Sequence, residues 1–382
     1  MVDVDRARIL DFRTARHHLD RRLTAGSLTE AAGAAGIQET DLGSAGISLF
    51  ARVRGMTPDR LREALTVDKS LVMVWAMRGA PYIVPTDEMA VFTTGSLPKG
   101  EESLRTYFGG WARSLSDVGS SLEALVARAA EVATDVLDGQ SLQVDGFRHA
   151  IAEHMPEIRG LKAPSGAHAD LPEPLFRLLG QMGVACIAET RRMTDAVIVR
   201  ADQWLGREQV ADGDDQARLD LLRRFLRCYG PATPQAFAEW TARSIAEVRE
   251  LFAVMEAELV AIDSDEWLLA DDVRALQARR RPSGVRLLPA RDPYLQQRDR
   301  ERLLPEQKER KLLWRPVGAP GLVMVDGEAA AIWKASRARD TLTVTVQRFV
   351  PLSASVRRRV SDEADAIAPF RGAKEAVVSY PD

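Results

Sequence analysis

A short polar run, Gln38-Glu39-Thr40-Asp41, interrupts an apolar stretch near the start of the chain. It brings together an amide, two carboxyls and a hydroxyl, which are side-chain types that can hold a water molecule or cap a helix. The run lies between two segments that we expect to be helical. Taken alone, the pattern favours capping, with Thr40 or Asp41 as the N-cap of a helix over residues 41–54.

Other catalytic patterns do not occur in the sequence. His149 and His154 are five residues apart and His17 and His18 are adjacent, so no spacing places two imidazoles and a third ligand on one helix face. The sequence contains no glycine-rich phosphate loop and no Gly-x-Ser-x-Gly turn. We therefore expect no metal and no cofactor.

The composition is that of an ordinary globular protein. The chain has 382 residues, 46% of them hydrophobic and 28% charged, which suits two to three domains. No apolar run approaches the roughly 20 residues that span a bilayer, and the N-terminus has no signal-peptide core. Cys186 and Cys228 lie in apolar contexts and are expected to be buried thiols in a reducing compartment. We expect a cytoplasmic protein that does not contact a membrane.

The charge is unevenly distributed along the chain. The formal net charge is −3, which excludes a globally basic nucleic-acid binder. Residues 279–315 nevertheless hold ten Arg and two Lys against two Asp and three Glu, a net charge of +7. This segment suits contacts with phosphates, and it equally suits an ordinary solvated surface.

Residues 57–85 predict a helix that leads directly into a two-stranded hairpin. Thr57 suits an N-cap and Pro58 the first helical turn. Two β-rich runs, 71–75 and 82–84, flank Arg78-Gly79. A helix followed by such a hairpin is the second half of a winged helix, in which the helix enters a DNA groove and the hairpin contacts the backbone.

Two further segments repeat this arrangement. The second has helices near 144–155 and 175–182 and a hairpin, 184–188 and 196–199, whose tip carries Arg191 and Arg192. In the third, Thr233-Pro234 begins one helix and Ser244-Ile-Ala-Glu247 is a capping box that begins another. The hairpin of the third segment, 259–262 and 267–270, has an acidic tip, so we expect it to pack inside the protein rather than against phosphate.

The remaining segments complete an α+β protein. We expect a first helix near 11–23 and connector helices near 101–111 and 122–137. Apolar or alternating runs after residue 280, with a hairpin turn at Asp326-Gly327, predict a compact β domain that ends in a helix and a strand. The predicted division is as follows: winged helix 1 over 1–95, a helical connector over 96–140, winged helix 2 over 141–210, winged helix 3 over 211–280, and the β domain over 281–382.

Several stretches, taken in order, resemble one family across nearly the whole chain. They are Gly36-Ile37-Gln38-Glu39-Thr40-Asp41, Leu49-Phe50-Ala51-Arg52-Val53-Arg54-Gly55, Val74-Trp75-Ala76-Met77-Arg78-Gly79, Tyr229-Gly230-Pro231-Ala232-Thr233-Pro234, Leu287-Leu288-Pro289-Ala290-Arg291-Asp292-Pro293-Tyr294, Arg298-Asp299-Arg300, Val325-Asp326-Gly327 and Trp333. Each stretch alone is weakly specific, whereas the ordered set is specific. The chain resembles the winged-helix DNA-binding proteins that include the AlkZ and YcaQ (AlkX) DNA glycosylases.

The resemblance implies a fold and an activity. It implies three tandem winged helices and a C-terminal β domain arranged as a C, with a basic concave channel. Glycosylases of this family remove alkylated bases and unhook interstrand crosslinks. A base alkylated at N7 or N3 is already cationic, so such an enzyme mainly has to place a water molecule and stabilise positive charge on the sugar.

The family's catalytic signature is Gln-hydrophobic-Gln or Gln-hydrophobic-Asp in the first winged helix. Here Gln38 matches the first position, Glu39 replaces the hydrophobic residue, and Thr40 stands at the second polar position. By this resemblance Gln38 positions the water, and Glu39, Thr40 or Asp41 supplies the second polar contact. The residues after Arg78-Gly79 also differ, since Ala80-Pro81-Tyr82 replaces the usual Thr-Leu-His.

The first hypothesis is thus a monofunctional glycosylase that acts on alkylated purines in double-stranded DNA. The alternative is a non-catalytic protein that binds DNA or damaged DNA on the same scaffold. A transcriptional regulator fits less well, because unlike tandem winged helices do not suit a symmetric operator. Arg78, Arg298 and Arg300 are the expected DNA contacts, the DNA is expected to be alkylated or crosslinked, and we expect a monomer.

Overall fold

A computed structural model describes residues 4–39, 41, 43–118, 121–162, 168–169, 171–189, 195–206, 214–263, 265–278 and 281–381. Contacts divide the chain into two compact units, each built from segments that are distant in sequence. Unit 1 holds residues 1–64, 224–236 and 258–382, and unit 2 holds 65–223 and 237–257. Helices and strands occur in both, so the expected α+β class is confirmed. Among the described residues no helix is long and apolar enough to cross a membrane.

Unit 1 contains the N-terminal helices and the C-terminal sheet. Its helices are α1 (Arg6–Arg16), α2 (Leu28–Gly33), α3 (Ser44–Arg52), α15 (Val273–Gln277), α16 (Arg300–Leu303), α17 (Gln307–Leu313) and α18 (Ala354–Ile367). Its strands are β1 (Ile37–Gln38), β9 (Leu259–Asp263), β10 (Glu266–Leu269), β11 (Val285–Leu288), β12 (Gly321–Val325), β13 (Glu328–Ala338), β14 (Thr341–Arg348) and β15 (Glu375–Ser379). Three helices have residues in both units: α4 (Pro58–Thr66), α12 (Asp214–Tyr229) and α13 (Pro234–Thr241).

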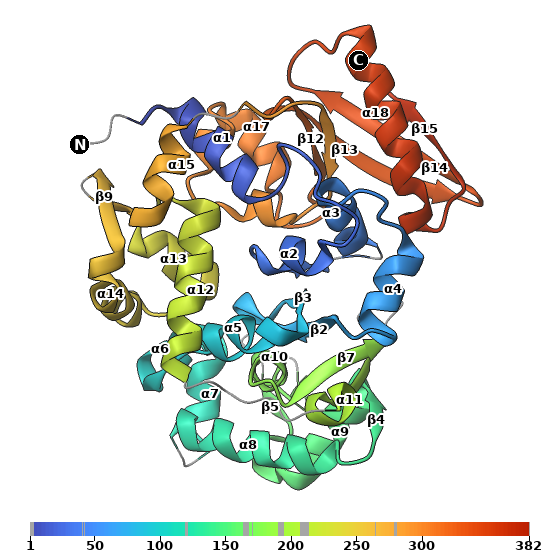
Figure 1. The fold of residues 1–382 in the computed structure, drawn as a ribbon. Helices are drawn as coiled ribbons and strands as arrows, with labels where there is room; N and C mark the ends of the chain where they lie inside the picture. Colours follow the sequence, from blue (N-terminus) through green and yellow to red (C-terminus); the bar gives the residue numbers. More distant parts are fainter. Residues whose placement is uncertain are drawn as a thin grey trace. The chain divides into compact units, whose positions relative to one another are not determined.

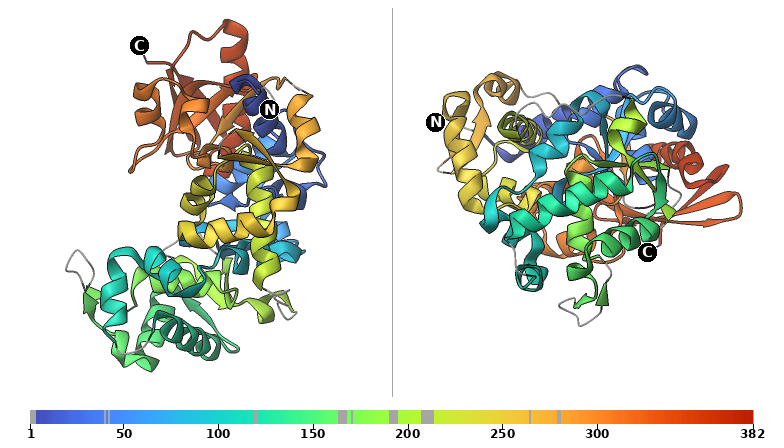
Figure 2. Two further views of the ribbon diagram at one scale, coloured as in Figure 1. Left: turned by 90° about the vertical axis from the view of Figure 1, so that its left-hand side faces the viewer. Right: turned by 90° about the horizontal axis from the view of Figure 1, so that it is seen from below.

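The C-terminal sheet has the strand order β11-β12-β13-β14-β15, with β14 and β15 parallel and the other pairs antiparallel. The turn at Asp326-Gly327 joins β12 to β13, as its sequence predicts. Helix α18 packs against β11 and β15, and Figures 1 and 2 show this red helix beside the C-terminal sheet. A hydrophobic core joins this sheet to the N-terminal segment, since Leu10, Leu19 and Ala51 are buried with Leu288 and Met324. The β domain is therefore packed against residues that lie between 237 (Ala51 to Leu288) and 314 (Leu10 to Met324) positions earlier in the chain.

Unit 2 is built on a sheet with the strand order β3-β2-β7-β8-β4. Its strands are β2 (Leu71–Trp75), β3 (Pro81–Pro85), β4 (Ser141–Gln143), β5 (Leu161–Lys162), β6 (His168–Ala169), β7 (Ala185–Glu189) and β8 (Val197–Arg200). Its helices are α5 (Met89–Phe92), α6 (Gly100–Phe108), α7 (Ala112–Ser116), α8 (Leu122–Val136), α9 (Val144–His154), α10 (Glu173–Gln181), α11 (Ala201–Leu205) and α14 (Ile245–Val254). Figure 1 labels most of these elements along the chain.

Close packing holds helix α10 on this sheet. The ring of Trp75, on β2, meets the ring of Phe176 edge-on at 5.2 Å between centroids. A Cβ on Gly180 would lie 2.2 Å from the Trp75 ring, so only glycine lets α10 approach the strand this closely. Aromatic packing thus fixes where α10 lies against β2.

The expected limits of the first helix in unit 1 are wrong. The first helix runs from Arg6 to Arg16 rather than over 11–23, because Asp5 caps it by accepting from the Arg8 N–H at 2.8 Å, and the chain turns at His18 with φ +56°. The third hairpin packs inside unit 1, as expected, since Ile262 and Leu268 are buried with Ile9 and Phe12, while its tip residues Asp263 and Asp265 are exposed. Hydration of these carboxylates explains their position, because burying an unpaired charge is costly. The tip residues Arg191 and Arg192 of the second hairpin lie outside the described residues.

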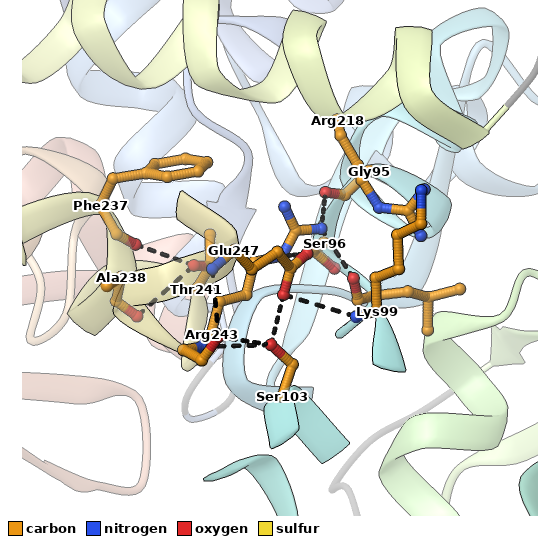
Figure 3. Close-up of polar contacts among 12 residues, drawn as sticks. Gly95, Ser96, Lys99, Ser103, Arg218, Phe237, Ala238, Thr241, Arg243 and Glu247 are labelled. Atoms are coloured by element: carbon orange, nitrogen blue, oxygen red, sulfur yellow. Dashed lines mark hydrogen bonds and ion pairs between the residues drawn. The ribbon is translucent and has the colours of Figure 1, made fainter. Parts of the chain in front are cut away.

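A buried polar network fixes the start of α14 in unit 2 (Figure 3). Ser244 caps the helix by accepting from the Glu247 N–H at 3.2 Å, as its sequence predicts. The Glu247 carboxylate does not complete the capping box. It accepts from Ser103 Oγ at 2.5 Å and lies 3.4 Å from Nε of Arg243. Arg243 Nη2 in turn donates to the Leu97 carbonyl at 2.7 Å, so this ion pair ties α14 to the segment before α6.

Both cysteines are buried thiols. Cys186 lies on β7 in unit 2, and Cys228 lies on α12 within unit 1, where its Sγ donates to the Ala34 carbonyl at 3.1 Å. Burial raises the pKa of each thiol to about 12. The expectation of buried thiols is confirmed.

Candidate functional site

Gln38 lies on the short strand β1, between helices α2 and α3 of unit 1. Its side chain is 8% exposed, and the neighbouring Ile37 is 1% exposed. The side-chain oxygen Oε1 of Gln38 accepts a hydrogen bond from Nε2 of Gln296 at 3.1 Å. Gln296 is also 8% exposed, so two buried carboxamides from distant parts of the chain meet at this point.

The carboxylate of Glu39 lies at the start of helix α3. Its Oε1 accepts from the Gly43 N–H at 3.0 Å, and its Oε2 accepts from the Ala45 N–H at 2.7 Å and from Ser44 Oγ at 3.3 Å. Glu39 therefore performs the capping that the sequence suggested for Thr40 or Asp41. Burial raises the pKa of Glu39 to about 7, although the hydrogen bonds from Ala45 and Gly43 act in the opposite direction.

Gly43 explains why the chain can turn between Glu39 and the helix. It is the N-cap of α3 and has a left-handed φ of +78°. A Cβ at this position would lie 2.0 Å from the carbonyl oxygen of Phe370, which leaves no room for another residue. The start of α3 is thereby held against the 3-10 helix η10 (Ala368–Arg371).

Asp41 faces a different partner. Its carboxylate forms an ion pair with Arg371, with 2.6 Å between Oδ2 and Nη1, and its side chain is 57% exposed. The carboxyls of Glu39 and Asp41 are therefore in different environments, one partly buried among helix N–H groups and the other neutralised at the surface. Thr40 lies outside the described residues.

A buried ion pair joins α3 to the segment that carries Gln296. Arg52, at the end of α3, donates from both terminal nitrogens to the Asp292 carboxylate at 2.7 and 2.8 Å, and both side chains are at most 1% exposed. Oδ1 of Asp292 also accepts from the Tyr294 N–H at 3.0 Å, which caps the 3-10 helix η9 (Pro293–Gln296). This bidentate pair sets how α3 and η9 are placed against each other.

Comparisons with known proteins now give the family. The model of the AlkZ-like DNA glycosylases matches residues 31–370. The chain belongs to the AlkZ-like DNA glycosylase family. A curated relative, the interstrand DNA cross-link repair glycosylase of Streptomyces sahachiroi, is 24% identical over 300 residues, which cover 74% of this chain and 75% of the relative.

A solved structure shows that the fold of this AlkZ-like chain is shared. The Streptomyces sahachiroi DNA glycosylase AlkZ superimposes with a TM-score of 0.75 at 22% identity, covering 98% of this chain and 99% of that one. The resemblance inferred from the ordered sequence motifs is therefore confirmed as a family relationship.

The expected DNA contacts of this AlkZ-like protein are distributed over both units. In unit 1, Arg298 and Arg300 are half-buried, and the guanidinium of Arg300 lies 5.0 Å from the centre of the Trp314 ring. In unit 2, Arg78 has φ +57°, and its Nη1 donates to the Trp240 carbonyl at 2.6 Å. Whether these arginines contact phosphate stays a prediction.

Sequence reasoning overlooked Gln296. It lies between two stretches that carry the family resemblance, the one that ends at Tyr294 and the one that begins at Arg298, and is a polar residue in a buried segment. That contrast could have indicated an internal role, but the sequence offers no sign that its partner is Gln38. Within the described residues no group of three His, Cys, Asp or Glu side chains is arranged to hold a metal ion.

Proposed function

We propose that this protein is a monofunctional DNA glycosylase that hydrolyses the N-glycosidic bond of purines alkylated at N7 or N3 in double-stranded DNA. The carrying observation is Gln38, which occupies the first position of the family signature and has its carboxamide held by Gln296 at 3.1 Å. A buried amide in a fixed orientation is suited to placing one water molecule. No metal or cofactor takes part in this proposal.

The chemistry needs little beyond that placement. The bond from C1′ to the cationic purine breaks, and the purine leaves as a neutral base with the bonding electrons. The water oxygen then bonds to C1′ of the oxocarbenium-like sugar. The proton that this water loses passes to a nearby proton acceptor or to solvent. Groups that are preorganised around the developing positive charge contribute most of the acceleration.

Glu39 is the better candidate for the carboxylate that stabilises this charge. Burial removes water from its ionised form and thereby raises its pKa to about 7. A nearby cation would compensate for the lost hydration. Asp41 is more exposed and already neutralised by Arg371. We assign water placement to Gln38, charge stabilisation to Glu39, and the remaining polar contact to Thr40 from its signature position.

The finer architecture belongs to the same proposal. Helix–hairpin segments over 1–95, 141–210 and 211–280 would be the three winged helices, with the connector over 96–140 and the β domain over 281–382. In support, the hairpins β2–β3, β7–β8 and β9–β10 each follow a helix. We propose a cytoplasmic monomer that binds duplex DNA through a basic channel by means of Arg78, Arg298 and Arg300. The name of the Streptomyces relative makes crosslinked duplex a second substrate to test.

Excision of N7-methylguanine from a duplex oligonucleotide tests the proposal. Under single-turnover conditions, Gln38→Ala should slow excision by about 10²–10³-fold, the usual cost of removing one preorganised polar group. Gln140→Ala, at an exposed position in unit 2, is the matched control and should be unchanged. Thr40→Gln and Thr40→Asp, which restore the family signature, should raise the rate.

A different outcome would favour the binding protein. If the wild type and both Thr40 variants leave N7-methylguanine in place yet bind the duplex, the enzyme proposal fails. One observation favours this alternative, because both carboxylate oxygens of Glu39 already cap α3.

A further inference from the structure

We propose that Gln296 is a positioning residue of the Gln38 site, and that it fixes which way the Gln38 carboxamide faces. This inference rests on the proposed glycosylase function and deepens it. Gln296 Nε2 makes two described contacts, with Gln38 Oε1 at 3.1 Å and with the carbonyl of Arg291 at 3.2 Å. Gln296 reaches Gln38 from η9, which lies outside the family signature.

The contact with Arg291 settles the orientation of both amides. A backbone carbonyl can only accept, so the Gln296 atom that faces Arg291 must be the nitrogen. The same nitrogen faces Gln38, and the Gln38 atom that meets it must therefore be an acceptor, Oε1. Gln296 thus selects one of the two amide orientations of Gln38, with Oε1 toward η9 and Nε2 turned away from it.

The support beneath Gln296 is rigid. Gln296 ends η9, whose first turn is capped by Asp292, and Asp292 is held by the buried bidentate pair with Arg52. Arg291 provides its carbonyl from a left-handed turn with φ +60°. The position of Gln296 is therefore set by α3, which begins just after the polar run that contains Gln38.

This arrangement explains how the site can work with an altered signature. In the family pattern a second amide or carboxylate follows two residues after the first Gln, whereas this chain has Thr40 there. A side chain as flexible as glutamine loses rate when it samples unproductive rotamers, and a misplacement of about 1 Å can cost on the order of 10²-fold. Gln296 restrains Gln38 from outside the signature.

The first test compares Gln296→Met with Gln307→Met. Met keeps the approximate volume of Gln296 and removes the donor, whereas Gln307 is exposed on α17 and serves as the matched control. We expect Gln296→Met to lower the single-turnover excision rate by about 10- to 100-fold, with the dissociation constant for the damaged duplex changed by less than about 2-fold. An equal loss in binding and rate would indicate a general structural role and overturn the inference.

A double-mutant cycle gives a second test. If Gln296 acts through Gln38, adding Gln296→Met to Gln38→Ala should slow excision by less than about 3-fold further. Independent, multiplying losses would overturn the inference.

Gln296→Glu supplies a rescue that depends on pH. An ionised carboxylate cannot donate to Gln38 Oε1, whereas the protonated acid can. The rate of this variant relative to wild type should therefore rise as the pH is lowered, and a constant ratio from pH 5 to pH 8 would contradict the proposal. This variant keeps the test decisive even where Met impairs folding.

The outcomes separate this inference from the proposed function. No excision by the wild type defeats the glycosylase proposal and the inference with it. Excision by the wild type at a rate unchanged in Gln296→Met defeats the inference alone. A readout without turnover is the ¹⁵N spectrum, in which the side-chain NH₂ signals of Gln296 should shift and exchange faster in Gln38→Ala. Unaltered signals would also overturn it.

Discussion

Each unit of this protein places a glutamate side chain at the start of a helix. Different groups compensate the negative charge of these two carboxylates. In unit 2, Glu247 at the start of α14 meets the buried guanidinium of Arg243 and the hydroxyl of Ser103. In unit 1, Glu39 at the start of α3 meets two backbone N–H groups and a hydroxyl. A formal countercharge is present in the first case, and only dipoles are seen among the contacts of the second.

The difference shows in the ionisation of the groups. Burial lowers the pKa of Arg243 to about 10, still far above neutrality, so the arginine in unit 2 stays charged at physiological pH. Burial raises the pKa of Glu39 to about 7, and the nearby charge of Asp41 adds to the shift. The unit 2 cluster is therefore suited to holding segments together, whereas Glu39 can gain or lose a proton near neutral pH.

The largest expected effect comes from breaking the countercharged cluster. Arg243→Met should lower the free energy of unfolding by about 3–5 kcal/mol, because it leaves the Glu247 carboxylate buried without its cation. Urea denaturation measures the change. Arg62→Met, which removes an exposed pair with Asp59, is the control and should change stability by less than about 1 kcal/mol. Equal effects of the two variants would contradict the comparison.

Glu39→Gln should change how stability depends on pH. The pKa of Glu39 is raised from 4.5 to about 7 on folding, so its protonated form stabilises the fold fully below pH 4.5, and this contribution is lost as the pH rises through about 7. The stability of wild type relative to Glu39→Gln should fall by roughly 2–3 kcal/mol between pH 4.5 and pH 8. If the stability of wild type and of Glu39→Gln changed in parallel over this pH range, the charge of Glu39 would be compensated as well as that of Glu247.

The smallest expected effect concerns the surface arginines. Binding to undamaged duplex should weaken with salt, with a log–log slope of roughly −3 to −5. Arg300→Ala should make this slope shallower by about one unit, since each lost phosphate contact contributes about 0.9. Fluorescence anisotropy across a salt series measures it. The control is Arg128→Ala, which removes an exposed arginine on α8, and a slope unaltered by Arg300→Ala would remove Arg300 from the set of DNA contacts.

Much of the fold follows from local signals in the sequence. Ser244 begins α14 and Asp326-Gly327 turns β12 into β13, as expected, because caps and tight turns are decided by a few adjacent residues. The predicted limits of the first helix are wrong for the opposite reason. Its apolar pattern continues past His17, whereas the true limits depend on the cap at Asp5 and the turn at His18.

The candidate site was predicted less completely. The polar run marked the right place, and the sequence could show that one of its residues caps α3. It could not show that Glu39 does so by reaching forward to Gly43 and Ala45, while Asp41 turns to Arg371. The partner of Gln38 is 258 residues away, so no local pattern could indicate it. Side-chain pairing across such a separation depends on tertiary packing alone.

The buried cysteines bear on how this protein withstands the reagents that damage DNA. Alkylating electrophiles react with thiolates far faster than with thiols. With a pKa of about 12, each cysteine is ionised in roughly one molecule in 10⁵ at neutral pH. Cys186 and Cys228 are also shielded from solvent, and these are the only two cysteines in the chain. Both thiols of such a protein can therefore stay unmodified in a cell exposed to electrophiles that alkylate purines.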